Sequence, residues 1–397
     1  MVRLFLSNYK KIMKVAFIHD HPFCEKNGKY YSTSGLPAAA WNRYLVNNDD
    51  LYVFGRRSGT GAKSLSSRAH VNFYLSKVYN TPLELLHKRQ KIKKELSDFV
   101  ADKDCVILRV PSILGLLGCE VAKEQNKPYL LEVVADAYES YRHYGNALGL
   151  LFARIYDNWT RKLVSESQYT LYVTQDYLQK RYPNSNKQLA CTNAVINPVS
   201  EDVLTKRIAK IENRKSSRII CGEIGDVSVK FKGCHIMLQA MKLLKNDGIE
   251  VEFHVVGGGS PEKMRKLALK LGVLDNFHFD GFISHDKITD FYDSLDVYVH
   301  PSFQEGLPRV VVEAISRGCP CAVSTAAGTP ELVEDEYLHE PGDAKKLASD
   351  IKKLVQDKAE TIRVAKTNFC HARSYYSDEL DRRRAEFYGN FFNSVKK

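Results

Sequence analysis

Two glutamates, Glu305 and Glu313, lie in a stretch whose order predicts the ligand-binding edge of a parallel sheet. The apolar run 297–300 is typical of a short buried strand. Pro301 and Gly306 end that strand, so Glu305 falls in the loop just past it. Glu313 follows roughly one turn into a predicted helix. Ligands of open parallel sheets bind beyond the carboxyl ends of the strands, so one glutamate can face a reacting group while the other anchors a more distant hydroxyl.

The helix that carries Glu313 is expected to begin at Pro308, because proline has the backbone angle of a first helical residue and needs no amide partner there. Gly318 is expected to end this helix, and the next strand is predicted over 320–324. The free amide groups at the start of such a helix attract anions.

Three consecutive glycines, 257–259, follow the predicted strand 251–256. They do not complete the G-x-G-x-x-G pattern, and no suitably placed acidic residue follows them, so a dinucleotide-binding dehydrogenase is disfavoured. The chain also lacks the GK[ST] pattern of a P-loop. The glycines alone therefore leave the ligand of this turn open.

The elements that must position these residues fall into two sets. A chain of 397 residues is too long for one ordinary core, and strand-like runs alternate with helical patterns in both halves. This alternation predicts an α/β fold with two doubly wound parallel sheets. The polar and highly charged stretch 200–218 separates the halves, as a linker or a bridging helix would. We expect a first domain over 13–200, a linker over 201–217 and a second domain over 218–374.

Strands are predicted at 14–18, 51–54, 105–108, 129–134, 169–173, 218–221, 251–256, 276–279 and 297–300. Helices of the second half are predicted at 234–244, 261–271, 286–294, 329–333 and 343–354, followed by a terminal helix over 375–392. Asp343 is the expected N-cap of the helix that ends at Leu354.

A long connection over 19–36 follows the first strand and is rich in Gly, Ser, Asn and Tyr. Loops of this length are usually functional or disordered, and a position beyond a strand end favours function. Gly35 and Leu36 open the following helix as a contact for an anion or a sugar. A second polar cluster follows the strand 129–134 and comprises Asp136, Glu139, Arg142 and His143, which line a cleft or simply start a charged helix.

The net charge of +11 indicates an anionic partner, for which a nucleoside diphosphate, an acidic membrane face and a nucleic acid are the candidates. Nucleic acid is disfavoured, because no zinc spacing, RNA-binding aromatic motif or helix-turn-helix pattern accompanies the charge. Basic residues gather at Lys10–Lys14, 88–94 and 206–218. A basic amphipathic helix over Thr81–Phe99 predicts either contact with anionic lipid or a solvated helix face.

The chain contains no apolar run of 18 residues, and its first residues lack the apolar centre and cleavage site of a secretory signal. Nine cysteines, an odd number without a C-x-x-C pair, indicate reduced thiols. We therefore expect a cytoplasmic protein, peripheral on the inner face of the membrane if the basic helix binds lipid. Met13 is an alternative start to Met1.

Glu305 and Glu313, separated by seven residues and framed by HPS, EGLPR and EA, resemble the E-x7-E signature of retaining glycosyltransferases of the GT-B fold, glycosyltransferase family 4. The resemblance implies two Rossmann-like domains that face each other across a cleft, with the terminal helix 375–397 crossing back to the first. It implies transfer of a hexosyl unit from a UDP- or GDP-linked sugar to a saccharide or lipid-linked saccharide, in cell-surface polysaccharide synthesis. No metal and no separate cofactor are expected.

On the donor side, the resemblance implies that Glu305 contacts donor-sugar hydroxyls beside the reaction centre and that Glu313 holds the ribose. Lys232, in the sequence KFKG, and Lys230 stabilise the departing diphosphate together with the amides of Gly306 and Leu307. The remaining residues implied to bind the donor are Gly257, Gly258, Phe282 and Ile283.

The chain departs from the family pattern at two positions. Glu223 replaces the usual arginine after the first strand of the second domain, and Lys230 or Arg309 is expected to compensate. Ala135 stands where many relatives have a histidine, which leaves Asp136 as the catalytic candidate on the acceptor side. In the family, the glycine-bearing loop that corresponds to Gly35 lines the acceptor side and approaches the donor phosphate.

Two alternatives within the GT-B fold stay open: a catalytically silent partner subunit and a nucleotide-sugar 2-epimerase. The presence of Glu305, Glu313 and Lys232 argues against a silent subunit, whereas Ala135 and Glu223 leave it open. A GT-A transferase is disfavoured, because the D-x-D pattern at 102–104 precedes a strand instead of following one.

Overall fold

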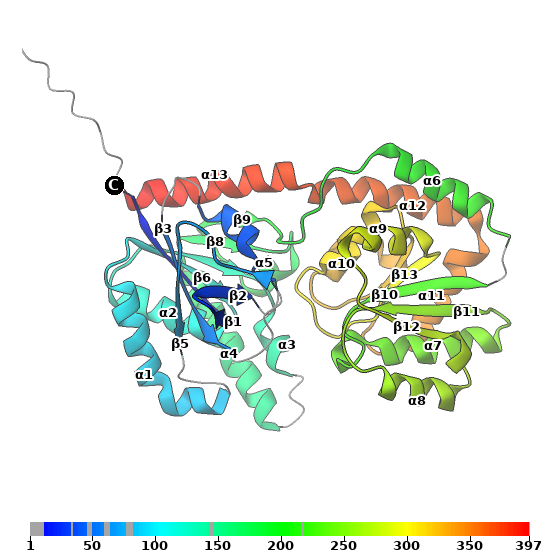
Figure 1. Cartoon of the computed structure of the whole chain (residues 1–397), viewed down its shortest axis with the longest axis horizontal. Coiled ribbons are helices and arrows are strands. Elements are labelled where there is room, and N and C mark those ends of the chain that lie inside the picture. The colour runs from blue at the N-terminus through cyan, green and yellow to red at the C-terminus, as the bar shows by residue number, and fades with distance from the viewer. Residues whose placement is uncertain are drawn as a thin grey trace, which may run out of the picture.

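The computed structural model describes residues 12–32, 35–45, 50–58, 64–76, 82–142, 147–215 and 218–396. The chain forms two α/β lobes that lie side by side, each built around its own sheet (Figure 1). The predicted fold class is confirmed. Several predictions fall partly outside the described residues. They concern the start at Met1, the basic cluster from Lys10, the first residue of the helix predicted from Thr81, residues 216–217 of the linker, and His143.

The first lobe contains a mostly parallel sheet whose strands run in the order β5-β3-β1-β6-β7-β8-β9. Its central strands β6, β7 and β8 are buried apolar runs, as expected for a sheet covered on both faces. The strands of the sheet are β1 (Lys14–Lys26), β3 (Asp50–Arg57), β5 (Val71–Ser76), β6 (Cys105–Val110), β7 (Tyr129–Val133), β8 (Tyr169–Tyr172) and β9 (Lys187–Ala190), with β2 (Lys29–Ser32) and β4 (Ser64–Leu65) added antiparallel. The helices of this lobe are α1 (Pro82–Val100), α2 (Ile113–Glu124), α3 (Ala137–Arg142), α4 (Ala147–Glu166) and α5 (Tyr177–Arg181).

The long functional loop predicted over 19–36 is wrong for most of its length. Strand β1 continues to Lys26 and folds back into β2 through a turn at Asn27 and Gly28, whose φ angles are 51° and 69°. Two positive φ angles in an Asn-Gly pair are the requirement of a tight two-residue hairpin turn, which this pair meets without strain. Among the described residues of this range, Gly35 and Leu36 remain in a loop ahead of the 3-10 helix η1 (Ala38–Arg43).

The second lobe contains a parallel sheet with the strand order β12-β11-β10-β13-β14-β15. Its strands are β10 (Ile219–Ile224), β11 (Val251–Val256), β12 (Phe277–Gly281), β13 (Val297–His300), β14 (Cys321–Ser324) and β15 (Leu338–His339). The strand order reverses between β10 and β13, and ligands of such sheets bind at the carboxyl ends of the two strands beside that point.

The helices of the second lobe are α6 (Glu201–Glu212), α7 (Cys234–Asn246), α8 (Glu262–Leu271), α9 (His285–Ser294), α10 (Arg309–Ser316), α11 (Ala344–Gln356) and α12 (Lys358–Ala372). The predicted cap is confirmed, because the Asp343 side chain accepts hydrogen bonds from the amides of Lys345 and Lys346. The predicted start at Pro308 is wrong by one residue: Pro308 is the N-cap, with an extended ψ of 112°, and α10 begins at Arg309. The helix predicted over 329–333 is only a 3-10 turn, η4 (Thr329–Glu331).

Two chain segments pass between the lobes. The first leads into α6, which packs on the second lobe through Arg207, a buried side chain that donates to the carbonyls of Tyr292 and Leu295. The second leads into α13 (Ser377–Val395), which runs along the first lobe (Figure 1) and buries Tyr388 in its core. The two segments pair where they cross, by a parallel bridge between Ile196 and Tyr376.

The basic helix α1 packs its apolar side inward, with Ile92 and Leu96 fully buried in the core of the first lobe. Its lysines and arginines at 88–91 face solvent. None of the helices within the described residues combines the length and the apolar character needed to cross a membrane.

Candidate active site

A buried histidine, a glutamate and a lysine meet at the carboxyl edge of the second sheet. His300 is the last residue of β13 and is fully buried, and its Nε2 lies 2.9 Å from Oε1 of Glu305. Nζ of Lys232 donates to the same oxygen at 2.7 Å. The loop after β13 therefore holds Glu305 between two nitrogen groups at the point where the strand order reverses.

These contacts set the charge of Glu305. Burial alone would raise the pKa of its carboxyl group, but His300 and Lys232 outweigh that effect and lower the pKa to about 2. Glu305 is therefore an anion at neutral pH, with hydrogen-bond acceptor capacity to spare on its second oxygen.

The position of Lys232 is fixed by the turn that follows it. Lys232 ends the 3-10 helix η2 (Lys230–Lys232), and Gly233, with a φ of 83°, is the N-cap of α7. A Cβ atom at Gly233 would lie 1.9 Å from the carbonyl oxygen of Pro301. The amide of Phe303 donates to the carbonyl of Phe231 at 2.7 Å, so the turn and the loop that carries Glu305 are bound together. Lys230, in contrast, is exposed.

Glu223, which replaces the usual arginine, lies beneath Lys232 and is almost fully buried. Among the described residues, neither of its carboxylate oxygens has a hydrogen-bond partner. Burial raises the pKa of this carboxyl group to about 8, a shift that Lys232 opposes and Glu305 reinforces. At neutral pH Glu223 is therefore mostly protonated, and the anion in contact with Lys232 is Glu305.

Glu313 lies one turn into α10, as predicted. Its Oε2 accepts from the hydroxyl of Tyr292 at 3.0 Å, and its Oε1 accepts from Nε of Arg309 at 2.8 Å. Tyr292 is buried and Arg309 is exposed. One oxygen of Glu313 is therefore bonded to the core of the second lobe, and the other lies on the solvent side.

The predicted glycine turn follows β11 and packs against the loop after β10. Gly257 has a φ of 142°, and a Cβ atom there would lie 2.0 Å from the carbonyl oxygen of Gly225, so only glycine fits. Gly258 lies beside the ring of Phe282, which is 79% exposed, and Ile283 follows at the half-buried edge. This arrangement leaves an aromatic face open to solvent next to the glycine turn.

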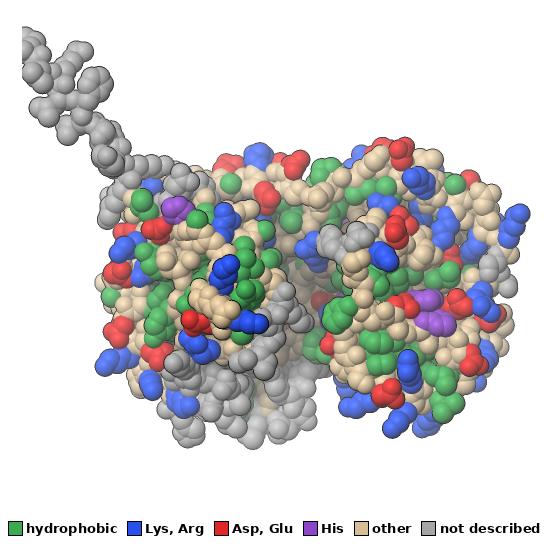
Figure 2. Space-filling model, viewed as in Figure 1, with side chains coloured by type: hydrophobic (Ala, Val, Ile, Leu, Met, Phe, Trp, Pro, Cys, Tyr) green, Lys and Arg blue, Asp and Glu red, His purple; other side chains and the backbone are tan. Residues whose placement is uncertain are grey.

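Glu305 lines a cavity of about 330 Å³ between the lobes. The second lobe contributes Phe303, Gln304, Glu305 and residues after β14, and the first lobe contributes Glu139 and Tyr177. The two lobes are in close contact at Gly306, because a Cβ atom at this position would lie 2.6 Å from the carbonyl oxygen of Val134 in the first lobe. In the space-filling view, the two lobes meet at a groove (Figure 2).

Asp136 is buried at the start of α3 and does not line this cavity. One carboxylate oxygen accepts from the amides of Tyr138 and Glu139 and from the hydroxyl of Tyr182. The other accepts from the hydroxyl of Tyr177 at 2.7 Å and from Nε of Arg181 at 3.0 Å. In this arrangement Asp136 orients Tyr177, whose ring reaches the cavity.

The predicted contact Gly35 and Leu36 lies in a second cavity between the lobes, of about 550 Å³. Arg309 of the second lobe lines the same cavity, so these three predicted residues are brought together. Its other charged lining residues are Arg43, Arg109, Asp381 and Arg384, and this excess of guanidinium groups favours an anion.

Four residues of the cleft, His300, Arg43, Arg109 and Glu331, were given no role by the sequence-based prediction. His300 was signalled by its place at the end of a strand and in the HPS frame of the motif, whereas Arg43 and Arg109 had no local motif. Glu331 spans the cleft: its carboxylate accepts from the amides of Gln175, Asp176 and Tyr177 at 2.6, 3.0 and 2.8 Å. The side chain of one lobe therefore caps the start of α5 in the other.

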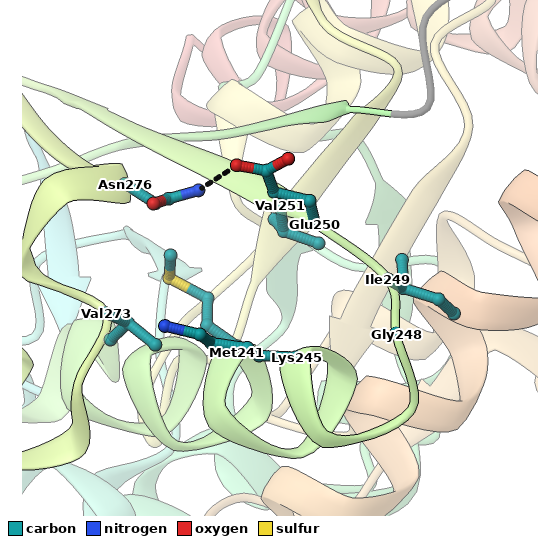
Figure 3. A pocket seen from close by; sticks show the side chains of 8 residues that line it. All are labelled: Met241, Lys245, Gly248, Ile249, Glu250, Val251, Val273 and Asn276. Atoms are coloured by element: carbon teal, nitrogen blue, oxygen red, sulfur yellow. Dashed lines mark hydrogen bonds between the residues drawn. The ribbon is translucent and has the colours of Figure 1, made fainter.

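A further cavity of about 270 Å³ lies near the start of β11, at the edge of the sheet opposite the glycine turn. It is lined by Met241, Lys245 and Val273, and by Glu250, which accepts from Asn276 at 3.4 Å (Figure 3). Its position at the amino ends of the strands separates it from Glu305.

Comparisons with known proteins agree with this geometry. Residues 205–369 match the family described as "Glycosyl transferases group 1". Protein CapJ of Staphylococcus aureus is 32% identical over 351 residues, which cover 87% of this chain and 87% of CapJ. The amylovoran biosynthesis glycosyltransferase AmsK of Erwinia amylovora is 31% identical over 143 residues, 34% of this chain and 35% of AmsK.

Solved structures show the same fold at lower identity. Sucrose-phosphate synthase of Thermosynechococcus elongatus superposes with a TM-score of 0.71 at 15% identity, over 96% of this chain and 100% of that chain. HepE of Anabaena, solved with UDP-glucose, gives a TM-score of 0.64 at 18% identity, over 95% of this chain and 100% of that chain. The fold is GT-B, and the chain belongs to the group 1 glycosyltransferases.

Proposed function

We propose that this glycosyltransferase moves a hexosyl unit, with retention of anomeric configuration, from a nucleoside diphosphate sugar to a hydroxyl of a saccharide or lipid-linked saccharide. The observation that carries the proposal is the contact of Lys232 and His300 with Glu305 beside a cavity that both lobes line. A fixed cation and a fixed anion at one edge match a substrate that offers a diphosphate and sugar hydroxyls.

Glu305 acts as an acceptor of hydrogen bonds from the donor sugar. Because its pKa is lowered to about 2, it stays ionised, and Lys232 and His300 keep it in place. Lys232 has three N–H donors and uses one on Glu305, so the others can bind the diphosphate as its negative charge grows. Lys230 and the amides of Gly306 and Leu307 complete the anion site, with no metal and no separate cofactor in the reaction.

The nucleoside is assigned to the region between the glycine turn and α10. Glu313 accepts from the ribose hydroxyls, and Gly257 and Gly258 allow close approach of the backbone. The exposed ring of Phe282 and the neighbouring Ile283 pack on the base. A uridine nucleotide is the first donor to test, because HepE was solved with UDP-glucose.

The acceptor enters from the first lobe. Tyr177 and Glu139 line the cavity beside Glu305, and Asp136 holds Tyr177 in place. The arginine-lined cavity at Gly35 and Leu36 suits an acceptor that carries phosphate, as a lipid-linked saccharide does. A role in polysaccharide biosynthesis is supported by the similarity to AmsK, which is named for amylovoran biosynthesis.

The test is a donor panel assayed for release of UDP or GDP, with and without saccharide and lipid-linked acceptors and with EDTA throughout. We expect acceptor-dependent release with one donor, insensitive to EDTA, and a product whose NMR coupling shows the anomeric configuration of the donor. Release from no donor would indicate a silent subunit. Conversion of the donor to its 2-epimer without an acceptor would indicate an epimerase.

We also propose contact with an anionic membrane at α4 and α1. Leu151 and Ile155 of α4 are 56% and 51% exposed. The guanidinium group of Arg89 on α1 lies over the ring of Trp159, which is also on α4. Apolar side chains beside exposed cations are the combination that binds acidic lipid surfaces. Flotation with vesicles containing phosphatidylglycerol should capture the protein, and Ile155→Asp should release it. Equal binding to neutral vesicles would refute an electrostatic contribution.

A further inference from the structure

Two histidines and two carboxylates lie on neighbouring strands of the second sheet, apart from the cleft between the lobes. His254 on β11 pairs in register with His278 on β12, and their rings stack with centroids 4.6 Å apart. Glu252 is two residues before His254, on the same face of β11. One oxygen of Glu252 and one ring nitrogen from each histidine all lie within 4.8 Å of one another.

The fourth residue, Asp280, lies behind the ring of His254. Its Oδ2 lies 3.0 Å from Nδ1 of His254, whereas Nε2 of that ring lies 3.9 Å from Oε2 of Glu252. A proton held on Nδ1 by the carboxylate leaves the Nε2 lone pair aimed at Glu252. A carboxylate behind the imidazole in this way is the usual second partner of a metal-binding histidine. Asp280 is two residues after His278 on β12, so it lies on the same face of the sheet and diagonal to His254.

The charge around these side chains also favours a cation. Arg218 donates to Oε1 of Glu252 at 2.6 Å and pairs with Glu250 at 3.3 Å, and with Asp280 the group comprises three carboxylates against one guanidinium. Arg218 occupies Oε1, which leaves Oε2 turned toward the histidines. Histidine side chains reach the surface of the second lobe between acidic neighbours (Figure 2), so an ion has access from solvent.

We propose that Glu252, His254 and His278 bind a divalent transition metal of the Zn²⁺ type, with water as the fourth ligand. Imidazole and carboxylate ligands suit this class of ion. Bonds of about 2.1 Å in a tetrahedral site place ligand atoms about 3.4 Å apart, so small side-chain rotations close the present spacing. The ion would clip β11 to β12 just before the glycine turn and Phe282, and it takes no part in sugar transfer.

The experiment uses the full-length chain without an affinity tag, stripped with a chelator and titrated with Zn²⁺ by calorimetry. We expect one equivalent to bind and the melting temperature to rise. His254→Ala and His278→Ala should each weaken binding at least tenfold, and Asp280→Asn should weaken it by about 10- to 100-fold. The matched control is His70→Ala, which removes an exposed histidine bonded to Asp50 at 2.9 Å in the first lobe and should bind as the unmodified chain does.

Titration with Co²⁺ identifies the ligands. Visible bands of tetrahedral Co²⁺ should appear without the thiolate charge-transfer band that the exposed Cys370 would give. No binding by the unmodified chain, or binding that both histidine variants retain, would overturn the proposal. Because donor turnover is expected to be unaffected by EDTA, failure of this site and failure of the proposed reaction are separate results.

Discussion

At the scale of single residues, the charge of the donor site depends on which neighbour each carboxylate has. Glu305 and Glu223 lie at the same sheet edge, with side chains that are mostly and almost fully buried, yet the pKa of Glu305 is lowered to about 2 and that of Glu223 is raised to about 8. The difference is that Glu305 bonds to His300 and Lys232, whereas Glu223 has no hydrogen-bond partner among the described residues. The ionisation of these two carboxyl groups therefore depends on their hydrogen-bond partners and not on their place at the sheet edge.

Replacing Lys232 by alanine should lower turnover by about 10²- to 10³-fold, since the departing diphosphate loses its fixed cation. Steady-state kinetics with the preferred donor would measure the effect, and circular dichroism would check the fold. The exposed neighbour Lys230, replaced by alanine, is the control in the same turn and should cost less. Near-normal turnover of a folded Lys232→Ala protein would sink the assignment of Lys232.

Replacing Glu223 by glutamine should stabilise the protein increasingly as pH rises from 5 to 8. The folded state holds the Glu223 proton up to about pH 8, whereas the unfolded state releases it near the ordinary glutamate pKa of 4.5. The folded state thus binds more protons in this window, and its stability falls by up to about 1.4 kcal/mol per pH unit. Glutamine removes that loss.

Urea unfolding at several pH values would measure this difference. The exposed Glu212→Gln serves as the control for removal of one negative charge. A Glu223→Gln difference that does not change between pH 5 and pH 8 would show that Glu223 is ionised in the folded protein.

At the scale of elements, the turn from η2 into α7 carries the geometry of the anion site. Gly233 is both left-handed, with φ of 83°, and pressed against the carbonyl of Pro301, so the turn cannot move away from the loop that holds Glu305. The same packing that lets α7 begin there therefore sets the distance between Lys232 and Glu305.

The variants Gly233→Ala and Gly248→Ala distinguish the effect of a positive φ angle from the effect of close contact with Pro301. Both glycines have similar φ angles, 83° and 77°, but a Cβ atom at Gly248 meets no atom within 4 Å. Gly233→Ala should be less stable than Gly248→Ala by about 1–3 kcal/mol, the cost of overpacking. It should also raise KM for the donor, because Lys232 is displaced. Equal losses of stability, measured by denaturant unfolding, would contradict the tight contact with Pro301.

Much of this element-scale structure follows from the sequence, and the exceptions have local causes. Strands β11 and β13 begin and end where their apolar runs do, and Asp343 caps α11, because burial and capping are properties of neighbouring residues. The hairpin β1–β2 was missed because polar residues interrupt the apolar pattern, although Asn27-Gly28 signalled the turn.

The site itself was only partly predictable. A sequence motif marks Glu305 and Lys232, but their contact joins residues 73 positions apart and depends on the packing of two loops. Nothing local to Glu331 indicates that its partners are the amides of α5 in the other lobe. Contacts of this kind are decided by tertiary packing, which periodicity and spacing do not record.

At the scale of the whole molecule, Glu331 holds the lobes together across the cleft. Its three bonds to the amides of Gln175, Asp176 and Tyr177 join η4 of the second lobe to the start of α5 in the first. They also place Tyr177 beside the cavity that Glu305 lines. Glu331 therefore contributes to the arrangement of the lobes and to the shape of the acceptor side.

Replacing Glu331 by alanine should shift the molecule toward an open form. The amides at the start of α5 would lose their acceptor and bind water instead, so we expect a larger radius of gyration by small-angle X-ray scattering and a higher KM for the acceptor. Glu334→Ala is the control, because Glu334 pairs with Arg363 within the second lobe. An unchanged radius of gyration with normal KM would show that other contacts close the cleft.

The pairing of Ile196 with Tyr376 limits how such opening can occur. The two chain segments that cross between the lobes are bonded side by side, through the amide of Ile196 to the carbonyl of Tyr375 at 3.0 Å and the amide of Ser377 to the carbonyl of Ile196 at 2.8 Å. The two segments that cross between the lobes are therefore joined at one point. We expect the lobes to rotate about this point without sliding past each other. Such rotation would bring Lys232 and Tyr177 back to the same register whenever the lobes come together.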